Sequence, residues 1–223
     1  MVTPRPRHID RCALVDLASS GLTLVELFAA IALALVLSGI ALPVLRSQIE
    51  ATRLERAERD VVAIAEALQR FRATNGVWPC RDASGNDSSL ALLFSGPTLP
   101  TSNPWSASTT WWALAASGAD VLDNHLVRNA PRGNQAAAYP TNLNRAWCGS
   151  YAAALPLDPW GRPYVVLVAA GHTTPTSSTP VHLLVLSAGL DGQIATTIQS
   201  AQAAPTVSAV DPTDIGLVLW RRS

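Results

Sequence analysis

The 223-residue chain contains no lysine, and its 16 basic residues are all arginines that balance 16 acidic residues. This zero net charge excludes binding to nucleic acid through bulk charge, because such binding rests on many phosphate contacts, and no nucleic-acid partner is expected. Only three cysteines occur and no CxxC pair, which excludes a zinc-ribbon or iron–sulfur framework. The GxSxG, HExxH, Walker and GxGxxG motifs are also missing, so no enzyme is predicted.

One apolar segment has the length of a membrane span. Hydrophobic residues make up 48% of the chain, enough for one modest core, and charged residues make up 14%. Between residues 22 and 45 the only ionisable side chain is Glu26. A helix over this segment is about 36 Å long, and a hydrocarbon core is about 30 Å thick. The arginines that precede it predict that residues 1–21 stay cytoplasmic and that the rest lies across the membrane.

Three interpretations of this N-terminal segment compete. It is a plain signal anchor, a secretory signal cut near Gly39-Ile40-Ala41, or a segment cut between Gly21 and Leu22. The long, partly acidic flank and Glu26 argue against an ordinary secretory signal. The third interpretation explains Glu26, because a carboxylate in a membrane helix is costly and cleavage creates an α-amine four residues before it. Pairing of Glu26 with the Leu22 amine of a neighbouring identical subunit would set the register between subunits.

The segment Gly21-Leu-Thr-Leu-Val-Glu26-Leu-Phe resembles the signature of type IV prepilins and type II secretion pseudopilins. In that family a cleavage glycine precedes a hydrophobic residue, and glutamate is the fifth mature residue. The resemblance implies that a prepilin peptidase cuts after Gly21 and methylates the amine of Leu22. Leu22 stands where Phe or Met is usual. Pro43 lies where many of these helices carry a proline, and a proline kinks a helix.

The helix is expected to continue through residues 46–75. Its apolar residues fall at spacings of three, four and seven and form one stripe: Leu54, Ala57, Val61, Ile64, Ala65, Leu68 and Phe71. The pattern ends at Asn75-Gly76, which is typical of a helix C-terminus. This stripe is expected to pack on the chain's own globular part. Residues 22–45 need lipid or other subunits instead, because no other segment is long enough to accompany them.

Residues 76–150 predict an irregular lobe with short helices, and their apolar pieces are 88–94 and 111–116. Its tryptophans are expected to fill a core rather than to bind a ligand. Removal of the leader with Cys12 would leave Cys80 and Cys148 in an oxidising compartment. A disulfide between these two is therefore favoured over two free thiols.

Residues 151–223 predict a sheet region with strands at Tyr164–Ala170 and Val181–Ser187. The segment from Leu155 to Tyr164, LPLDPWGRPY, resembles the start of the sheet in major type II secretion pseudopilins, and residues 187–192 and 214–216 resemble their later loop and chain end. The resemblance leaves 81–150 uncovered. It implies a calcium ion held by backbone carbonyls and by the matching acids Asp191 and Asp214, and Asp211 nearby is a further candidate ligand. An ordinary hydrogen-bonded turn remains the alternative, because Asp serves both roles.

Together these features predict an α+β, pilin-like fold, with a long N-terminal helix on a small antiparallel sheet. The resemblance implies a structural subunit of a type II secretion pseudopilus, anchored once in the inner membrane with its C-terminal domain in the periplasm. Identical copies would form a head-to-tail helical filament. The other expected partners are further pseudopilins, the prepilin peptidase, an inner-membrane assembly platform and membrane lipid. Two alternatives remain open: a type IV pilin or minor pilin for adhesion, motility or DNA uptake, and a membrane-anchored enzyme using scattered histidine or aspartate residues.

Overall fold

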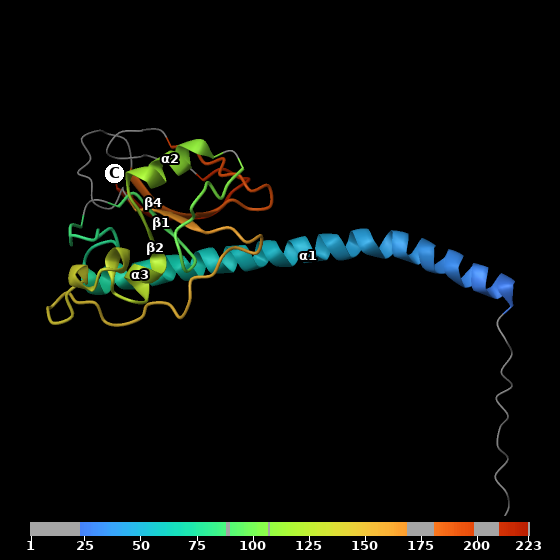
Figure 1. Cartoon of the computed structure of the whole chain (residues 1–223), viewed down its shortest axis with the longest axis horizontal. Helices are drawn as coiled ribbons and strands as arrows, with labels where there is room; N and C mark the ends of the chain where they lie inside the picture. The colour runs from blue at the N-terminus through green and yellow to red at the C-terminus, as the bar shows by residue number, and fades with distance from the viewer. Residues whose placement is uncertain (1–22, 88–89, 107, 169–180, 199–209, 223) are drawn as a thin grey trace, which may run out of the picture. The chain divides into compact units, whose positions relative to one another are not determined.

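A computed structural model of the chain describes residues 23–222, apart from residues 88–89, 107, 169–180 and 199–209. The chain divides into two compact units, residues 1–47 and residues 48–223, and each unit is described by itself. Helices and strands both contribute, and the predicted α+β class is confirmed (Figure 1).

The long helix α1 spans Leu24–Asn75 and is the main element of the N-terminal part of the chain. It ends where the Asn-Gly pair predicts. Gly76 has a φ of +75°, and its amide donates to the carbonyl oxygen of Arg72 at 2.7 Å. Glycine adopts this left-handed conformation without the steric cost that a Cβ imposes, and the bond satisfies a carbonyl of the last helical turn.

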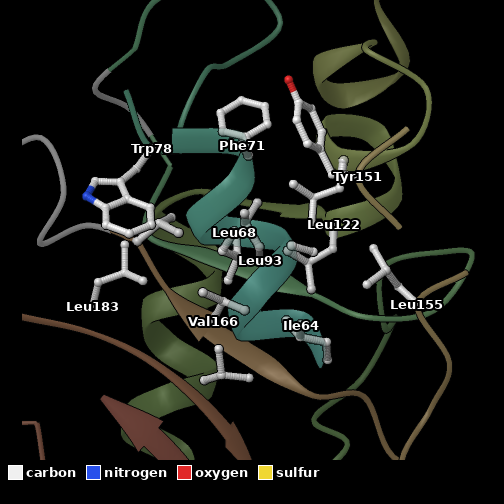
Figure 2. Close-up of a cluster of buried hydrophobic side chains, with 14 of the residues drawn as sticks. Ile64, Leu68, Phe71, Trp78, Leu93, Leu122, Tyr151, Leu155, Val166 and Leu183 are labelled. Carbon is white, nitrogen blue, oxygen red and sulfur yellow. The ribbon is translucent and has the colours of Figure 1, made fainter. Parts of the chain in front are cut away.

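Within the second unit, α1 buries one face against a sheet. The buried face carries Ala57, Val61, Ile64, Ala65, Ala67, Leu68 and Phe71. Figure 2 shows Ile64, Leu68 and Phe71 packed with side chains of the strands and of the lobe, among them Leu93, Val166 and Leu122. Leu54 is 45% exposed, so the buried stripe begins one turn later than predicted.

The sheet has five strands in the order β2-β1-β3-β4-β5. Three of the four strand pairs are antiparallel, and β1 pairs with β2 in parallel. The strands are β1 (Leu92–Phe94), β2 (Ala119–Val121), β3 (Val165–Leu167), β4 (Val181–Ser187) and β5 (Ile215–Arg222). The predicted bounds of β4 are confirmed, whereas β3 is shorter than the predicted strand, whose last two residues lie outside the described part of the chain.

Strands β1 and β2 correct the expectation that residues 76–150 are irregular with only short helices. The run around Leu93 forms a strand, and every residue of β1 and of β2 is buried. In a short run that is buried on both faces, apolar residues recur neither at the spacing of a helix nor at every second position as in a half-buried strand. The sequence of such a run therefore does not distinguish a strand from a helix. The expected apolar helix at 111–116 is confirmed as part of α2 (Thr109–Ser117).

Both faces of the sheet are covered, as the alternation of side chains along a strand allows. On one face Leu93, Val166 and Val185 join the core with α1. On the other face Leu92, Phe94 and Leu186 form a second core with Trp105 and Trp111. Trp105 and Trp111 are each 2% exposed, and Trp112 and Trp147 are partly buried and pack against the two cores, as expected of tryptophans that serve the core.

The predicted disulfide between Cys80 and Cys148 is wrong, because both residues are free thiols. The Cys80 thiol is buried and donates to the carbonyl oxygen of Asp87 at 2.6 Å. Burial, together with the charge of Asp87, raises the pKa of Cys80 to about 12, which keeps the thiol protonated and unreactive. Cys148 is exposed, and its thiol donates to the carbonyl oxygen of Ala146 at 3.2 Å.

The packing of α1 on the sheet predicts an asymmetric response to truncation of its side chains. Leu68 is 0% exposed and Val62, on the same helix, is 47% exposed. We expect Leu68→Ala to lower the free energy of unfolding by about 2–5 kcal/mol and Val62→Ala to lower it by less than about 0.5 kcal/mol. Denaturant titration of the full-length protein in detergent measures both. Similar losses in the two variants would contradict this packing.

Candidate functional site

The first turn of α1 holds Glu26 in a reciprocal set of hydrogen bonds with Thr23. The backbone amide of Thr23 donates to Glu26 Oε2 at 2.9 Å, and the Thr23 hydroxyl donates to the same oxygen at 3.0 Å. The Glu26 amide lies 3.3 Å from Thr23 Oγ1. This is a capping box, in which the cap residue and the third helical residue satisfy each other's backbone donors. The spacing Thr-x-x-Glu is the sequence signal of a capping box. The prediction from the sequence considered only a partner for Glu26 on a neighbouring subunit and overlooked this signal.

Beyond this cap, α1 presents an apolar surface to its surroundings. The large apolar side chains between Leu24 and Leu45 are 48–74% exposed in the single chain. Among the described residues α1 is also the one helix long and apolar enough to cross a membrane. Exposed apolar surface of this extent is costly in water, so this part of the helix requires lipid or another protein around it.

Not all predicted residues of this segment fall within the described part of the chain. Gly21 and Leu22, the predicted cleavage site, lie outside it, as does the whole predicted leader. Pro43 lies inside α1, which runs continuously through it, and the helix kink stays a prediction.

Two aromatic residues anchor the second half of α1 to the loop that leads into β3. Trp160 Nε1 donates to Glu50 Oε2 at 3.2 Å, and the Tyr164 hydroxyl donates to Asp60 Oδ2 at 3.1 Å. Burial and the neighbouring Asp60 carboxylate both raise the pKa of Tyr164, so its hydroxyl remains a donor. Both contacts lie on the segment LPLDPWGRPY, whose residues therefore join the helix to the sheet.

Asp158 organises the same loop from inside. The residue is 4% exposed, and its Oδ1 accepts the amides of Trp160 at 3.0 Å and Arg162 at 2.8 Å. Its Oδ2 accepts the Ser187 hydroxyl at 2.9 Å, at the end of β4. Arg162 in turn donates to the carbonyl oxygen of Gly189 at 2.9 Å. The Asp-Pro-Trp-Gly turn thus fixes the start of the loop at 187–192.

Two of the three acids of the predicted calcium site cap local turns, and the third, Asp214, binds a distant stretch of backbone. Asp191 Oδ1 accepts the Gln193 amide, and Asp211 Oδ1 accepts the Thr213 amide. Asp214 accepts the amides at 195 and 196 at 3.2 and 2.7 Å. Burial raises the pKa of Asp214 above its ordinary value despite these hydrogen bonds. No group of three or more His, Cys, Asp or Glu side chains gathers within the described ranges, so calcium binding stays a prediction that rests on the resemblance.

A buried polar network ties the lobe at 76–150 together where a disulfide was predicted. His125, which is 0% exposed, lies between Asp120 Oδ2 at 3.0 Å and the Tyr139 hydroxyl at 2.8 Å. Arg81 stacks on the Tyr139 ring at 4.5 Å and pairs with Asp87 through two bonds of 2.6 and 3.1 Å. Each buried charge therefore has a partner, which is the condition for burying charge at tolerable cost.

Comparison with known proteins finds a family model that matches part of the chain. Residues 127–204 match the family model for the type II secretion system (T2SS), protein G. This match confirms the pseudopilin resemblance. The matched segment includes the loop at 155–164, β3 and β4. It begins inside the lobe at 76–150, most of which the resemblance found in the sequence did not cover. No curated protein and no solved structure matches the chain significantly. Glu26 and α1 lie outside the matched segment, so their resemblance to pseudopilins is supported by their sequence alone.

The Asp120–His125 pair predicts an acid dependence of the stability of the second unit. Burial alone would raise the pKa of Asp120, but the hydrogen bond and charge of His125 and the amides of Arg132 and Val121 outweigh it, so this pKa is lowered. A carboxyl group whose pKa is lower in the folded state stabilises the fold at any pH above its pKa in the unfolded chain, about 3.9. This stabilisation is lost as the pH falls through the pKa of the folded state.

We therefore expect Asp120→Asn to lower the melting temperature at pH 7 and to flatten its fall in acid. Asp123→Asn, which removes one partner of a longer, 3.8 Å ion pair with the exposed Arg128, is the matched control and should change little. Circular dichroism melting of the full chain between pH 7 and pH 2 measures both. An unchanged acid slope in Asp120→Asn would contradict the stabilising role of this pair.

Proposed function

We propose that this pseudopilin is a structural subunit of a type II secretion pseudopilus, a periplasmic fibre whose growth drives protein export. The observation that carries the proposal is the match of residues 127–204 to protein G, the major pseudopilin. The exposed apolar face of α1 supplies the part that a fibre subunit needs: a surface stable in lipid before assembly and among like helices afterwards. The role is structural rather than enzymatic.

In this proposal the chain is inserted once in the inner membrane, with residues 48–223 in the periplasm. A prepilin peptidase removes residues 1–21 and methylates the new amine of Leu22. Processed subunits join copies of themselves and other pseudopilins at an inner-membrane assembly platform. One contact repeated head to tail gives an open helical filament rather than a closed ring.

The capping box gives Glu26 two successive partners in this sequence of events. Before assembly its carboxylate is held by the Thr23 amide and hydroxyl, which lowers the cost of placing it in the first turn of a membrane helix. Cleavage then places a positive amine on the residue directly before Thr23. In the fibre, Glu26 pairs with the Leu22 amine of a neighbouring subunit and sets the register of the two helices.

Processing is tested at the cleavage residue. Gly21→Ala should block removal of the leader, because a side chain at this position hinders the peptidase, and the full-length form should accumulate in the membrane. Immunoblotting of membranes that contain a prepilin peptidase separates the two lengths. Normal maturation of Gly21→Ala would refute cleavage at this position.

The charge of Glu26 is tested separately from its role as a cap. Glu26→Gln keeps a side chain that serves in a capping box but removes the negative charge, so we expect normal insertion and at least a tenfold loss of fibres. Thr23→Val removes the cap hydroxyl, costs about 1 kcal/mol of helix stability and should still assemble. Immunoblots of sheared fibres and of membranes measure both. Wild-type fibre yield from Glu26→Gln would show that register does not depend on the charge.

A further inference from the structure

The second unit begins directly beyond the apolar part of α1. The helix runs without a break from Leu24 to Asn75, its uncharged stretch ends at Leu45, and the second unit starts at residue 48. Glu50 lies about 8 Å beyond Leu45 along the helix axis. The headgroup layer of a bilayer is about 5–7 Å thick on each side of the hydrocarbon core. With the apolar stretch in a membrane, Glu50 therefore lies at the outer edge of the headgroup layer.

The loop at 155–164 is fixed at this same level. Trp160 Nε1 donates to Glu50 Oε2 at 3.2 Å, so the indole ring stays within reach of one side chain in the first turn of the unit. The Asp158 carboxylate holds the turn from inside by accepting the amides of Trp160 and Arg162. The loop therefore stays near the headgroup layer for as long as these hydrogen bonds persist.

The side chains at this end of the unit suit a bilayer surface. Leu157 is 39% exposed and Ile49 is 52% exposed, and the Trp160 ring is partly exposed. Tryptophan is enriched at membrane interfaces, because its ring is apolar and its N–H group is polar. Apolar side chains at this level are shielded from water by the headgroups and the upper acyl chains. Contact with lipid would therefore cover apolar surface that the described residues leave open.

The charges at this end are compatible with contact to phospholipid. Arg46 is the first charged residue after the apolar stretch, at the level where arginine side chains reach lipid phosphates. Glu50 is the first acidic residue after that stretch, and it pairs with Arg53 at 2.9 Å. The pairing offsets the repulsion that a single carboxylate would meet from lipid phosphates.

The opposite end of the unit offers an internal comparison. Asn75, at the end of α1, lies about 38 Å from Glu50 along the helix axis. Arg145 lies against Gly76, where an added Cβ would come within 2.6 Å of the Arg145 Cδ atom. Leu143 is close to Arg145 in sequence and is 62% exposed. An exposed leucine therefore marks this end of the unit as well, far along α1 from the loop at 155–164.

We propose that the loop at 155–164 rests on the phospholipid headgroup layer of the membrane that α1 crosses, with Leu157 and Trp160 in contact with lipid. The contact holds the second unit at a fixed height above the bilayer before assembly. The proposal rests on the membrane insertion that is part of the proposed function, but it requires neither processing nor a fibre. The two can therefore fail separately.

The test uses the full-length chain, one copy in each nanodisc of phosphatidylethanolamine and phosphatidylglycerol, with a bimane label on a single cysteine. Cys12→Ser and Cys148→Ser remove two native thiols, and Cys80 stays because its buried thiol is unreactive. Labels are placed by Leu157→Cys and, as the matched control, by Leu143→Cys. We expect nitroxides on the lipid headgroups to quench the label at 157 about threefold more than the label at 143, since the headgroup layer is much thinner than the distance between the two ends of the unit.

Two further labels make each outcome decisive. Pro156→Cys labels an exposed neighbour of Leu157 and avoids the contact that Leu157 makes with Gly96, and melting curves check that every variant stays folded. Leu33→Cys labels the apolar stretch, where nitroxides on the acyl chains should quench it. Quenching at 33 without stronger headgroup quenching at 156 and 157 than at 143 would overturn this inference alone and leave the surface to a neighbouring protein. No quenching at 33 would overturn membrane insertion and this inference together.

Discussion

The structure depends on an apolar helical surface that the described residues of the chain leave uncovered. Helix α1 buries its second half in a core of the second unit, whereas the large side chains between Leu24 and Leu45 stay open. Lipid or like helices are the two environments that such a surface tolerates. In the proposed function the subunit moves from the membrane into a fibre, and both environments would satisfy this same surface.

The loop at 155–164 joins α1 to the sheet, and in the proposed fibre it would carry force from the helix to the folded unit. Trp160 and Tyr164 contact Glu50 and Asp60 of α1, and Asp158 joins their loop to the end of β4. The helix is therefore connected to the sheet by these hydrogen bonds in addition to the packing of the hydrophobic core. The family match covers this loop.

Features with a local physical signal were predictable from the sequence. The Asn75-Gly76 pair marks the helix end, and the apolar run at β4 predicts its bounds. Strands β1 and β2 were missed because three buried residues carry no period. The disulfide was wrongly predicted because an oxidising compartment and the number of cysteines say nothing of the distance between Cys80 and Cys148 in the fold. The lobe is tied instead by Asp120, His125 and their partners, which come together only in the folded chain.

The central claim is that the native subunit begins at Leu22, with a positive amine four residues before Glu26. N-terminal sequencing with intact mass measurement of the protein from membranes tests it most directly. We expect a chain that starts at Leu22 and carries one added methyl group. A chain that retains residues 1–21, or one that begins at Leu42, would contradict the assembly of this protein as a pseudopilus subunit.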